Sequence, residues 1–179
     1  IFVPAGCKNN YNTKEPWSQF AVIDTEPVKT NIVLGHSDNL ADKLIEQGIQ
    51  PCNVNYLVLN GEVTLDDLQI IRDYMADLVY LDLRNTNIKH IPDYTFAQKI
   101  NLLTVYLPIE LKSIGVRAFD NCNRLGPELI LPSTVTSIEY GAFVNCRSLS
   151  TVRALGTNIT AVAEDVFGKG VESKLVYSN

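Results

Sequence analysis

Residues 105–125 read VYLPIELKSIGVRAFDNCNRL, and residues 129–149 repeat the pattern as LILPSTVTSIEYGAFVNCRSL. The two segments share Leu-Pro, Ser-Ile, Ala-Phe and Asn-Cys pairs, each displaced by 24 residues. A fixed period in this range is typical of stacked repeats that bury a continuous core between neighbours. We therefore predict an elongated array of similar units rather than a closed globule.

The period extends beyond this pair. Phenylalanines recur at steps of 23, 24 and 24 residues, at Phe96, Phe119, Phe143 and Phe167. Each unit opens with a Leu-x-Leu-like strand, whose first apolar residues are Leu57, Leu81, Val105, Leu129 and Val152. A second strand-like run follows at residues 88–91, 111–114, 135–138 and 159–162. We expect the strands to turn alternate apolar residues inward, and phenylalanine to stack on phenylalanine in the core.

The unit that begins at Leu57 differs, because a helical pattern replaces the second strand. Residues 64–67, Thr-Leu-Asp-Asp, predict a capping box, and apolar residues then follow at helical spacing to Met75. A second short helix is predicted over residues 38–47, with Asp38 as its cap and Gly48 as its stop. Helices at this position would cover the open end of the core.

The repeated segments resemble the BspA-like leucine-rich repeats of bacterial surface proteins, over about residues 54–168. The resemblance implies an α/β, right-handed, β-rich leucine-rich-repeat solenoid with repeats of 23–24 residues and a helical N-terminal cap unit. Residues 28–76 would form this cap unit and residues 77–179 the repeat array. The pattern departs from the family where Gln98-Lys99 replaces Asn-Cys, and where Gly170 replaces the last cysteine.

Residues 1–27 resemble a different part of the same family. The strand-like run Ile1-Phe-Val-Pro and the later Pro16-Trp17 are similar to the end and closing cap of a preceding array. We expect the chain to be a piece of a longer protein, cut between two arrays. The alternative is that residues 1–24 dock on the open C-terminal end, within the chain or on a neighbour.

Composition excludes several classes of function. The net charge is −5 with no cluster of lysine or arginine, so nucleic acid is not an expected partner. No run approaches the roughly 18 apolar residues that a membrane-spanning helix needs. Cys122 and Cys146 share one phase of adjacent repeats and are expected to be small buried hydrophobes. Cys7 and Cys52 have no metal-ligand spacing, and we expect neither a metal nor another cofactor.

Catalytic chemistry is not indicated either. His36 and His90 fall at surface positions without a neighbouring nucleophile motif. The carboxylate pair Asp66-Asp67 is explained by helix capping and the helix dipole, and Glu164-Asp165 by a solvated turn. We therefore predict that the chain is not an enzyme.

The outward-facing residues of the strands provide the candidate site. Side chains alternate between the two faces of a strand, and parallel strands lie about 4.8 Å apart, so outward-facing residues of adjacent strands should form one patch. Arg153 lies further along the same face. Tyrosine and arginine often dominate protein interfaces, although tyrosine also suits any solvated sheet. The candidate ligand-binding residues are Tyr56, Tyr80, Asp82, Arg84, Tyr106 and Arg153.

The resemblance implies non-catalytic recognition or adhesion, outside the cell or at its surface. The expected partners are host proteins, extracellular matrix or bacterial surface proteins, bound through the strand face. Two alternatives stay open at this point: a carbohydrate-binding module whose tyrosines stack on sugar rings, and a structural spacer within a larger surface protein.

Overall fold

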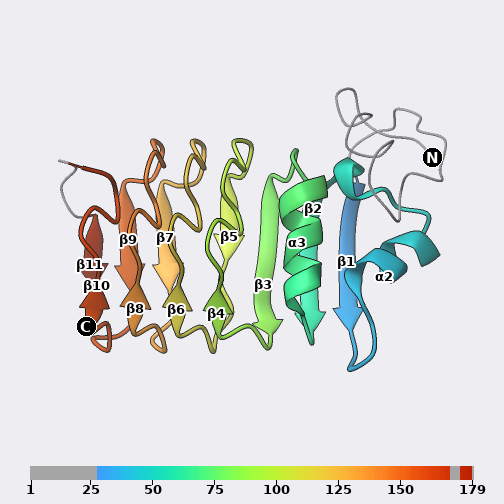
Figure 1. Cartoon of the computed structure of the whole chain (residues 1–179), viewed down its shortest axis with the longest axis horizontal. Helices are drawn as coiled ribbons and strands as arrows, with labels where there is room; N and C mark the ends of the chain where they lie inside the picture. The colour runs from blue at the N-terminus through green and yellow to red at the C-terminus, as the bar shows by residue number, and fades with distance from the viewer. Residues whose placement is uncertain (1–27, 170–173, 179) are drawn as a thin grey trace.

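The computed structural model describes residues 28–169 and 174–178, and these form a solenoid of parallel strands (Figure 1). The cap-like segment predicted at residues 1–27 lies outside the described residues, as do Cys7 and Gly170. The longer strands are β1 (Val28–Leu34), β2 (Val54–Gly61), β3 (Tyr80–Thr86), β5 (Thr104–Tyr106), β7 (Glu128–Leu131), β9 (Thr151–Ala154) and β11 (Leu175–Tyr177). Two-residue strands are β4 (His90–Ile91), β6 (Ser113–Ile114), β8 (Ser137–Ile138) and β10 (Ala161–Val162).

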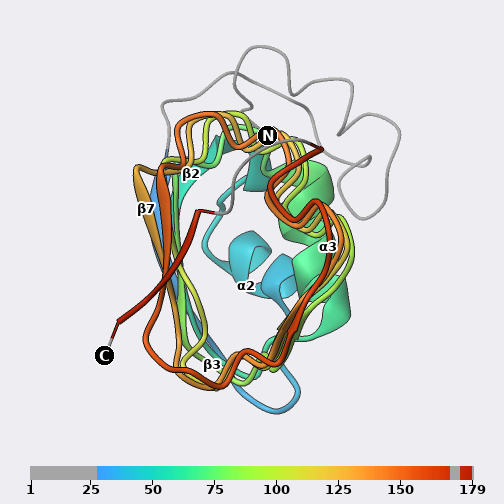
Figure 2. The same cartoon turned by 90° about the vertical axis from the view of Figure 1, so that its left-hand side faces the viewer.

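The longer strands line one side of the molecule. They form two sheets, β1-β2-β3-β5 and β7-β9-β11, while the two-residue strands form a third, β4-β6-β8-β10. Seen along the solenoid axis, the longer strands occupy one side of an oval outline, and helix α3 (Leu65–Tyr74) with the repeat turns occupies the other (Figure 2). We call the outer side of the longer strands the strand face.

The core is a ladder of equivalent side chains, as the period predicts. The rings of Phe96, Phe119, Phe143 and Phe167 follow one another at 5.2, 5.5 and 5.9 Å between centroids. Three of them are essentially inaccessible to solvent, because each fills the space between neighbouring units. Each ladder step buries apolar area without needing contacts from distant parts of the chain.

The turns that carry the phenylalanines share a backbone conformation that L residues rarely adopt. The residue two before each phenylalanine has positive φ, at Tyr94, Arg117, Gly141 and Asp165. The residue two after it does so as well, at Gln98, Asn121 and Asn145. Asparagine tolerates the left-handed region better than most residues, which accounts for its recurrence at the second position.

The helical cap unit also forms, with one correction. The predicted capping box of α3 is confirmed, because Thr64 and Asp67 exchange hydrogen bonds. Helix α2 (Leu40–Glu46) is capped by Asn39, whose side chain accepts from the N–H of Asp42, so the predicted cap at Asp38 is wrong. Asp38 lies one residue too early and accepts from the N–H of Gly35 instead. A 3-10 turn, η2 (Pro51–Asn53), leads from α2 into β2.

Cysteines occupy one column of the core, and a lysine replaces them in the first full repeat. The thiols of Cys122 and Cys146 are buried, and each donates to a carbonyl of the preceding unit, Phe96 and Phe119 respectively. Lys99 stands three residues after Phe96, in the same column, and is only 2% exposed. Its ammonium group donates to the carbonyl of Arg72 near the C-terminal end of α3.

The strand ladder is interrupted between β5 and β7. In the neighbouring units, the two residues after the closing leucine both donate their N–H to the residue before the preceding strand, as Ser150 and Thr151 do to Pro127. Here Gly126 makes the first of these bonds, to the carbonyl of Leu103, but the next residue, Pro127, is an extra residue with no N–H. The extra residue offsets β7, and the two strands belong to separate sheets.

Candidate functional site on the strand face

Three tyrosines form a comb across adjacent strands. The rings of Tyr56 and Tyr80 are parallel with centroids 3.9 Å apart, and Tyr80 meets Tyr106 at 5.7 Å and 57°. Cations border the comb, because Lys29 lies over Tyr56 at 5.3 Å and Arg84 lies over Tyr106 at 4.5 Å. The predicted grouping of these tyrosines is therefore present, but their ring faces pack on one another and on the two cations.

Tyr80 lies between the other two tyrosines of this comb and is half-buried. Burial, helped by a hydrogen bond with Tyr56 and by the charge of Asp82, raises the pKa of the Tyr80 phenol to about 12. The phenol therefore stays protonated and polar at neutral pH.

Asp82 lies in the outward column, as predicted, but is only 6% exposed. Arg84 folds back over it, donating from Nε at 3.0 Å and from Nη2 at 2.6 Å. Burial raises the pKa of Asp82, but the hydrogen bonds and charge of Arg84 outweigh it and hold the pKa below its usual value. Asp82 thus fixes the position of Arg84 instead of presenting a free carboxylate to solvent.

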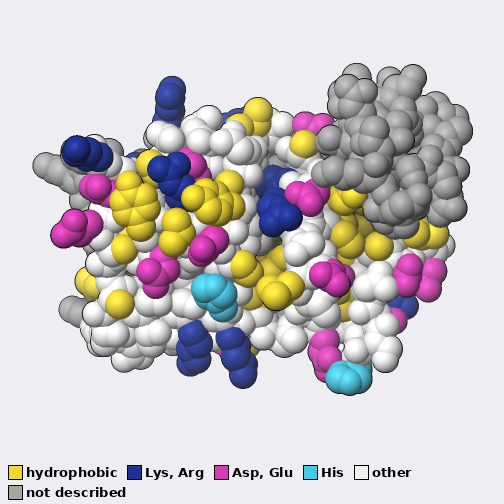
Figure 3. Space-filling model, in the orientation of Figure 1, with side chains coloured by type: hydrophobic (Ala, Val, Ile, Leu, Met, Phe, Trp, Pro, Cys, Tyr) yellow, Lys and Arg dark blue, Asp and Glu magenta, His cyan; other side chains and the backbone are white. Residues whose placement is uncertain are grey.

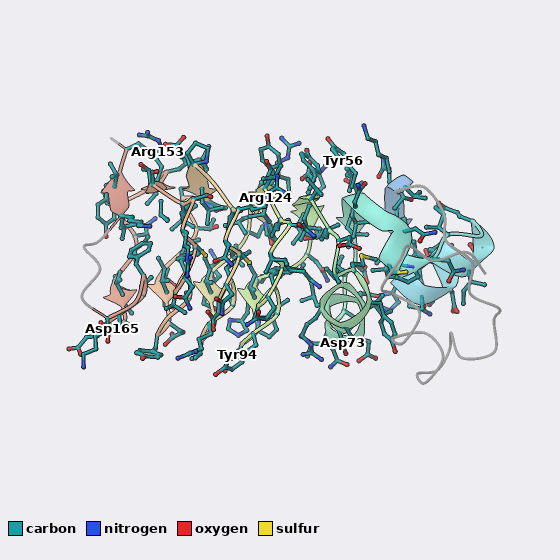
Figure 4. The ribbon with its side chains drawn as sticks, turned by 90° about the horizontal axis from the view of Figure 1, so that it is seen from above. Tyr56, Asp73, Tyr94, Arg124, Arg153 and Asp165 are labelled. Atoms are coloured by element: carbon teal, nitrogen blue, oxygen red, sulfur yellow. The ribbon has the colours of Figure 1, made fainter. Side chains whose placement is uncertain are left out.

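Arg153 belongs to the same face but not to the tyrosine comb. It lies on β9, in the second sheet. Its Nε donates to Glu128 Oε1 at 2.8 Å, and its Nη2 forms an ion pair with the same oxygen at 2.6 Å. Figure 4 shows Tyr56 and Arg153 along the strand side, and Tyr94, Asp73 and Asp165 along the opposite side. The predicted residues therefore divide into a cluster on β2, β3 and β5 and a separate ion pair on β7 and β9.

An open groove of about 500 Å³ separates these two groups. Its walls come from β5 and β7 and from the turns that follow them, and Arg84 and Glu128 lie at its rim. We call it the strand-face groove. Its exposed apolar side chains are Tyr106, Ile109, Ile130 and Leu155, and the last three are 62%, 45% and 51% exposed.

Sequence reasoning left Ile109, Ile130 and Leu155 out of the candidate site. A signal for two of them was present, because Ile130 and Leu155 are apolar at outward phases of their strands. A second signal was the four-residue step from Leu125 to Leu129, where neighbouring units step by three, as from Leu102 to Val105. This extra residue marks the place where the ladder opens.

The pairing of β2 with β3 shifts by one residue near its end. A bulge places Asn60 opposite Asn85, whereas strict alternation would place it opposite Arg84. The amides of Asn31, Asn60 and Asn85 then form a hydrogen-bonded ladder, with 3.0 Å at each step. The shift leaves Arg84 free to turn toward Asp82 and Tyr106.

The remaining surface shows no comparable concentration of chemistry in the described ranges. His36 pairs with Glu62, and His90 contacts Ser113, both at exposed positions. Within residues 28–169 and 174–178, no three His, Cys, Asp or Glu side chains gather as metal ligands, and no helix has the length and apolarity to cross a membrane. On the face that carries α3, acidic, basic and hydrophobic side chains are interspersed (Figure 3).

Comparison with known proteins agrees with this architecture. A leucine-rich repeat protein from Bacteroides ovatus superposes with a TM-score of 0.54 at 18% identity, covering 85% of this chain and 43% of that one. The chain thus spans less than half of that protein. The T. pallidum leucine rich repeat protein is 20% identical, with a TM-score of 0.47 over 80% of this chain and 67% of that one. No curated protein matches the sequence.

The family comparison is more specific. Six copies of the BspA type leucine rich repeat region match residues 77–175, which is more than half of the chain. The predicted resemblance and the predicted leucine-rich-repeat solenoid are confirmed. The chain belongs to the family of BspA type leucine rich repeats, a family of protein-interaction repeats that is generally non-enzymatic.

Proposed function

We propose that this chain is a non-catalytic recognition module of a bacterial cell-surface protein, and that it binds a protein partner through the strand face. Family membership supports protein interaction in general. The partner would be extracellular matrix, a host protein or a surface protein of another bacterium. The module would act outside the cell or at its surface.

The strand-face groove is the observation that carries this proposal. The groove exposes three large aliphatic side chains to solvent on a rigid backbone, those of Ile109, Ile130 and Leu155. Contiguous apolar surface bordered by polar groups is typical of interaction sites. Because the surrounding backbone is fixed by the repeats, little conformational entropy would be lost when a partner binds.

The packing of the tyrosines favours a protein over a glycan. Sugar rings bind by stacking on an open aromatic face. Here Tyr56 has Lys29 and Tyr80 for neighbours, and Tyr106 has Tyr80 and Arg84. These ring faces are therefore already in contact within the protein, whereas the groove beside Tyr106 is open to apolar side chains.

A binding screen with matched variants tests the proposal. The protein would be presented to matrix proteins, bacterial surface extracts and glycans, beside Ile130→Glu, which places a charge in the groove. Ile100→Glu is the matched control, because Ile100 is an equally exposed isoleucine outside the groove. A Tyr80→Ala/Tyr106→Ala variant tests the comb, with circular dichroism to confirm that every variant folds.

We expect a protein ligand whose binding is lost in Ile130→Glu and retained in Ile100→Glu. Binding that survives Ile130→Glu would place the site elsewhere on the molecule. Inhibition by soluble oligosaccharides would support the carbohydrate-binding alternative. No ligand for any folded variant would favour a structural spacer.

A further inference from the structure

The strand-face groove has Arg84 in its lining, and Arg153 is paired with the lining residue Glu128. This arrangement defines the chemistry of the groove's occupant. We propose that the groove binds an extended segment of the partner protein in which an acidic side chain stands beside apolar ones. Arg84 receives the carboxylate, and the apolar side chains enter the groove. This inference rests on the proposed function and specifies its ligand.

Arg84 has hydrogen-bond donors that Asp82 does not use. Its Nε and Nη2 are used by Asp82, whereas Nη1 makes no hydrogen bond within the described residues. The guanidinium is supported on one side by Tyr106, and the Arg84 side chain is 52% exposed, whereas the side chain of its counter-ion Asp82 is buried. An arriving carboxylate therefore meets the guanidinium, with the Asp82 carboxylate lying behind it.

Arg153 repeats this arrangement at the other side of the groove. Its Nε donates to Glu128, which is a groove residue, and its Nη2 forms an ion pair with the same carboxylate, while its Nη1 makes no hydrogen bond within the described ranges. Both arginines are fixed before a ligand arrives, so little side-chain entropy would be lost on binding. Planar guanidinium groups are well suited to carboxylates, because they offer paired donors.

The charge of the face agrees with an acidic ligand. The strands from β1 to β9 on this face carry three cations, Lys29, Arg84 and Arg153, against two anions, Asp82 and Glu128, which leaves +1. The whole chain carries −5. The strand face is therefore positive relative to the rest of the protein, and an acidic segment would be directed toward it.

The length of the groove indicates an extended segment. Its lining begins with Thr104 and Glu128 at the start of β5 and β7. It ends with Ile109 beyond β5, Ser133 beyond β7 and Leu155 beyond β9. Five residue steps along a strand span about 16 Å, so the groove would accommodate about five residues of extended chain. In such a segment alternate side chains point the same way, which places apolar residues in the groove and leaves the acid at its rim.

A phage library of random peptides, selected on the intact protein, provides the probe. Enriched peptides would be synthesised with blocked ends and measured against three variants. Asp82→Asn/Arg84→Gln removes the rim cation without leaving a buried carboxylate unpaired. Ile130→Glu blocks the groove, and Arg147→Gln is the control, because it removes an exposed arginine outside the groove.

We expect the enriched peptides to combine acidic and apolar residues. Their affinity should fall by about ten- to a hundredfold in Asp82→Asn/Arg84→Gln, as for the loss of a hydrogen bond to a charged group, and change little in Arg147→Gln. Replacing the acid of the peptide by its amide should reproduce the loss.

Two failures are distinguishable. Peptides that lose binding in Ile130→Glu, but bind Asp82→Asn/Arg84→Gln normally and contain no acid, would overturn the carboxylate inference while supporting the groove. Peptides that bind all variants equally, or no enrichment at all, would overturn both the inference and the proposed groove function.

Discussion

The ammonium group of Lys99 donates a hydrogen bond of 2.7 Å to the carbonyl oxygen of Arg72. This contact joins the first full repeat to the last turn of α3, where carbonyl groups lack partners within the helix. At this junction a buried ammonium stands where the next two repeats have Cys122 and Cys146. Burial lowers the pKa of Lys99 to about 8, because the charged form loses its hydration.

The substitution Lys99→Met should stabilise the protein at neutral pH, and its advantage should shrink as the pH rises. Below pH 8 the lysine is charged in both the folded and unfolded states, so its penalty is complete. Between pH 8 and the unfolded pKa of 10.5, the folded state releases its proton first, and the wild type gains stability. At about pH 10 this gain should reach roughly 2 to 3 kcal/mol.

Urea unfolding of both proteins at several pH values measures this difference. The hydrogen bond with Cys146, followed by burial, raises the pKa of the Cys122 thiol. This costs stability at high pH in both proteins, because Cys122 is present in each. Parallel pH profiles for the wild type and Lys99→Met would contradict the prediction.

Asp67 should be the most sensitive polar residue of the cap unit. Its carboxylate is fully buried and accepts from the N–H of Leu40 at 2.7 Å, from the N–H of Thr64 at 2.8 Å and from the Thr64 hydroxyl. It thus caps the first turns of both helices. Asp67→Ala should lower the free energy of unfolding by about 3 to 5 kcal/mol, since three donors lose a charged partner.

Thr64→Ala is the comparison for Asp67→Ala, because it removes a single cap and should cost only about 1 kcal/mol. Chemical denaturation gives both values. Equal losses for the two variants would show that the link between Asp67 and α2 contributes nothing.

Gln98 occupies a left-handed position at which the later repeats have Asn121 and Asn145. Gln98→Asn should stabilise the protein by about 0.5 kcal/mol, because asparagine visits this region at lower cost. The control is Gln69→Asn within α3, where asparagine is the weaker helix former and should destabilise by a few tenths of a kcal/mol. Thermal unfolding should therefore shift in opposite directions for the two variants.

The phenol of Tyr80 should titrate apart from the exposed tyrosines. Its raised pKa means that the unfolded state loses this proton first, so stability falls above about pH 10. Phenolate absorbance should contain a component near pH 12 that disappears in Tyr80→Phe. A titration curve whose high-pH component persists in this variant would assign it to another residue.

Deleting Pro127 should join the two sheets of the strand face. The extra residue between Leu125 and Leu129 would be removed, so β7 could pair with β5. Hydrogen exchange of the Leu129 and Ile130 amides should slow by about tenfold or more, and groove ligands should bind more weakly. Pro127→Ala restores the N–H but keeps the extra residue, and should leave both properties unchanged.

The repeat architecture was predictable because equivalent residues recur along the sequence at a fixed spacing. The spacing of the phenylalanines and of the Leu-x-Leu pairs fixes which side chains face inward, and an inward phase leaves few alternatives. The predicted second strands were longer than the observed ones, since in each run only the last two residues pair, as in His90–Ile91. The cap of α2 was misplaced by one residue, because Asp38 and Asn39 are adjacent and both have side chains that can cap a helix.

The candidate site was less predictable, because phase does not determine side-chain contacts. Alternation places Asp82 and Arg84 on one face, but the bulge and the stacking on Tyr106 decide that the arginine covers the carboxylate. Arg153 shares the face, yet the interrupted ladder separates it from the tyrosines. The groove itself follows from one extra residue, whose effect depends on how the neighbouring strands diverge.

The interrupted ladder also has a mechanical consequence. Each unit advances the solenoid by about 4.8 Å, whereas its 24 residues reach about 80 Å when drawn out, so a tethered array can lengthen greatly. Between β5 and β7 the strand side lacks a ladder, while β6 and β8 remain paired on the other side. Tension along the axis would therefore bend the array open at this seam before other units yield. Force along the array would therefore act first on the strand-face groove.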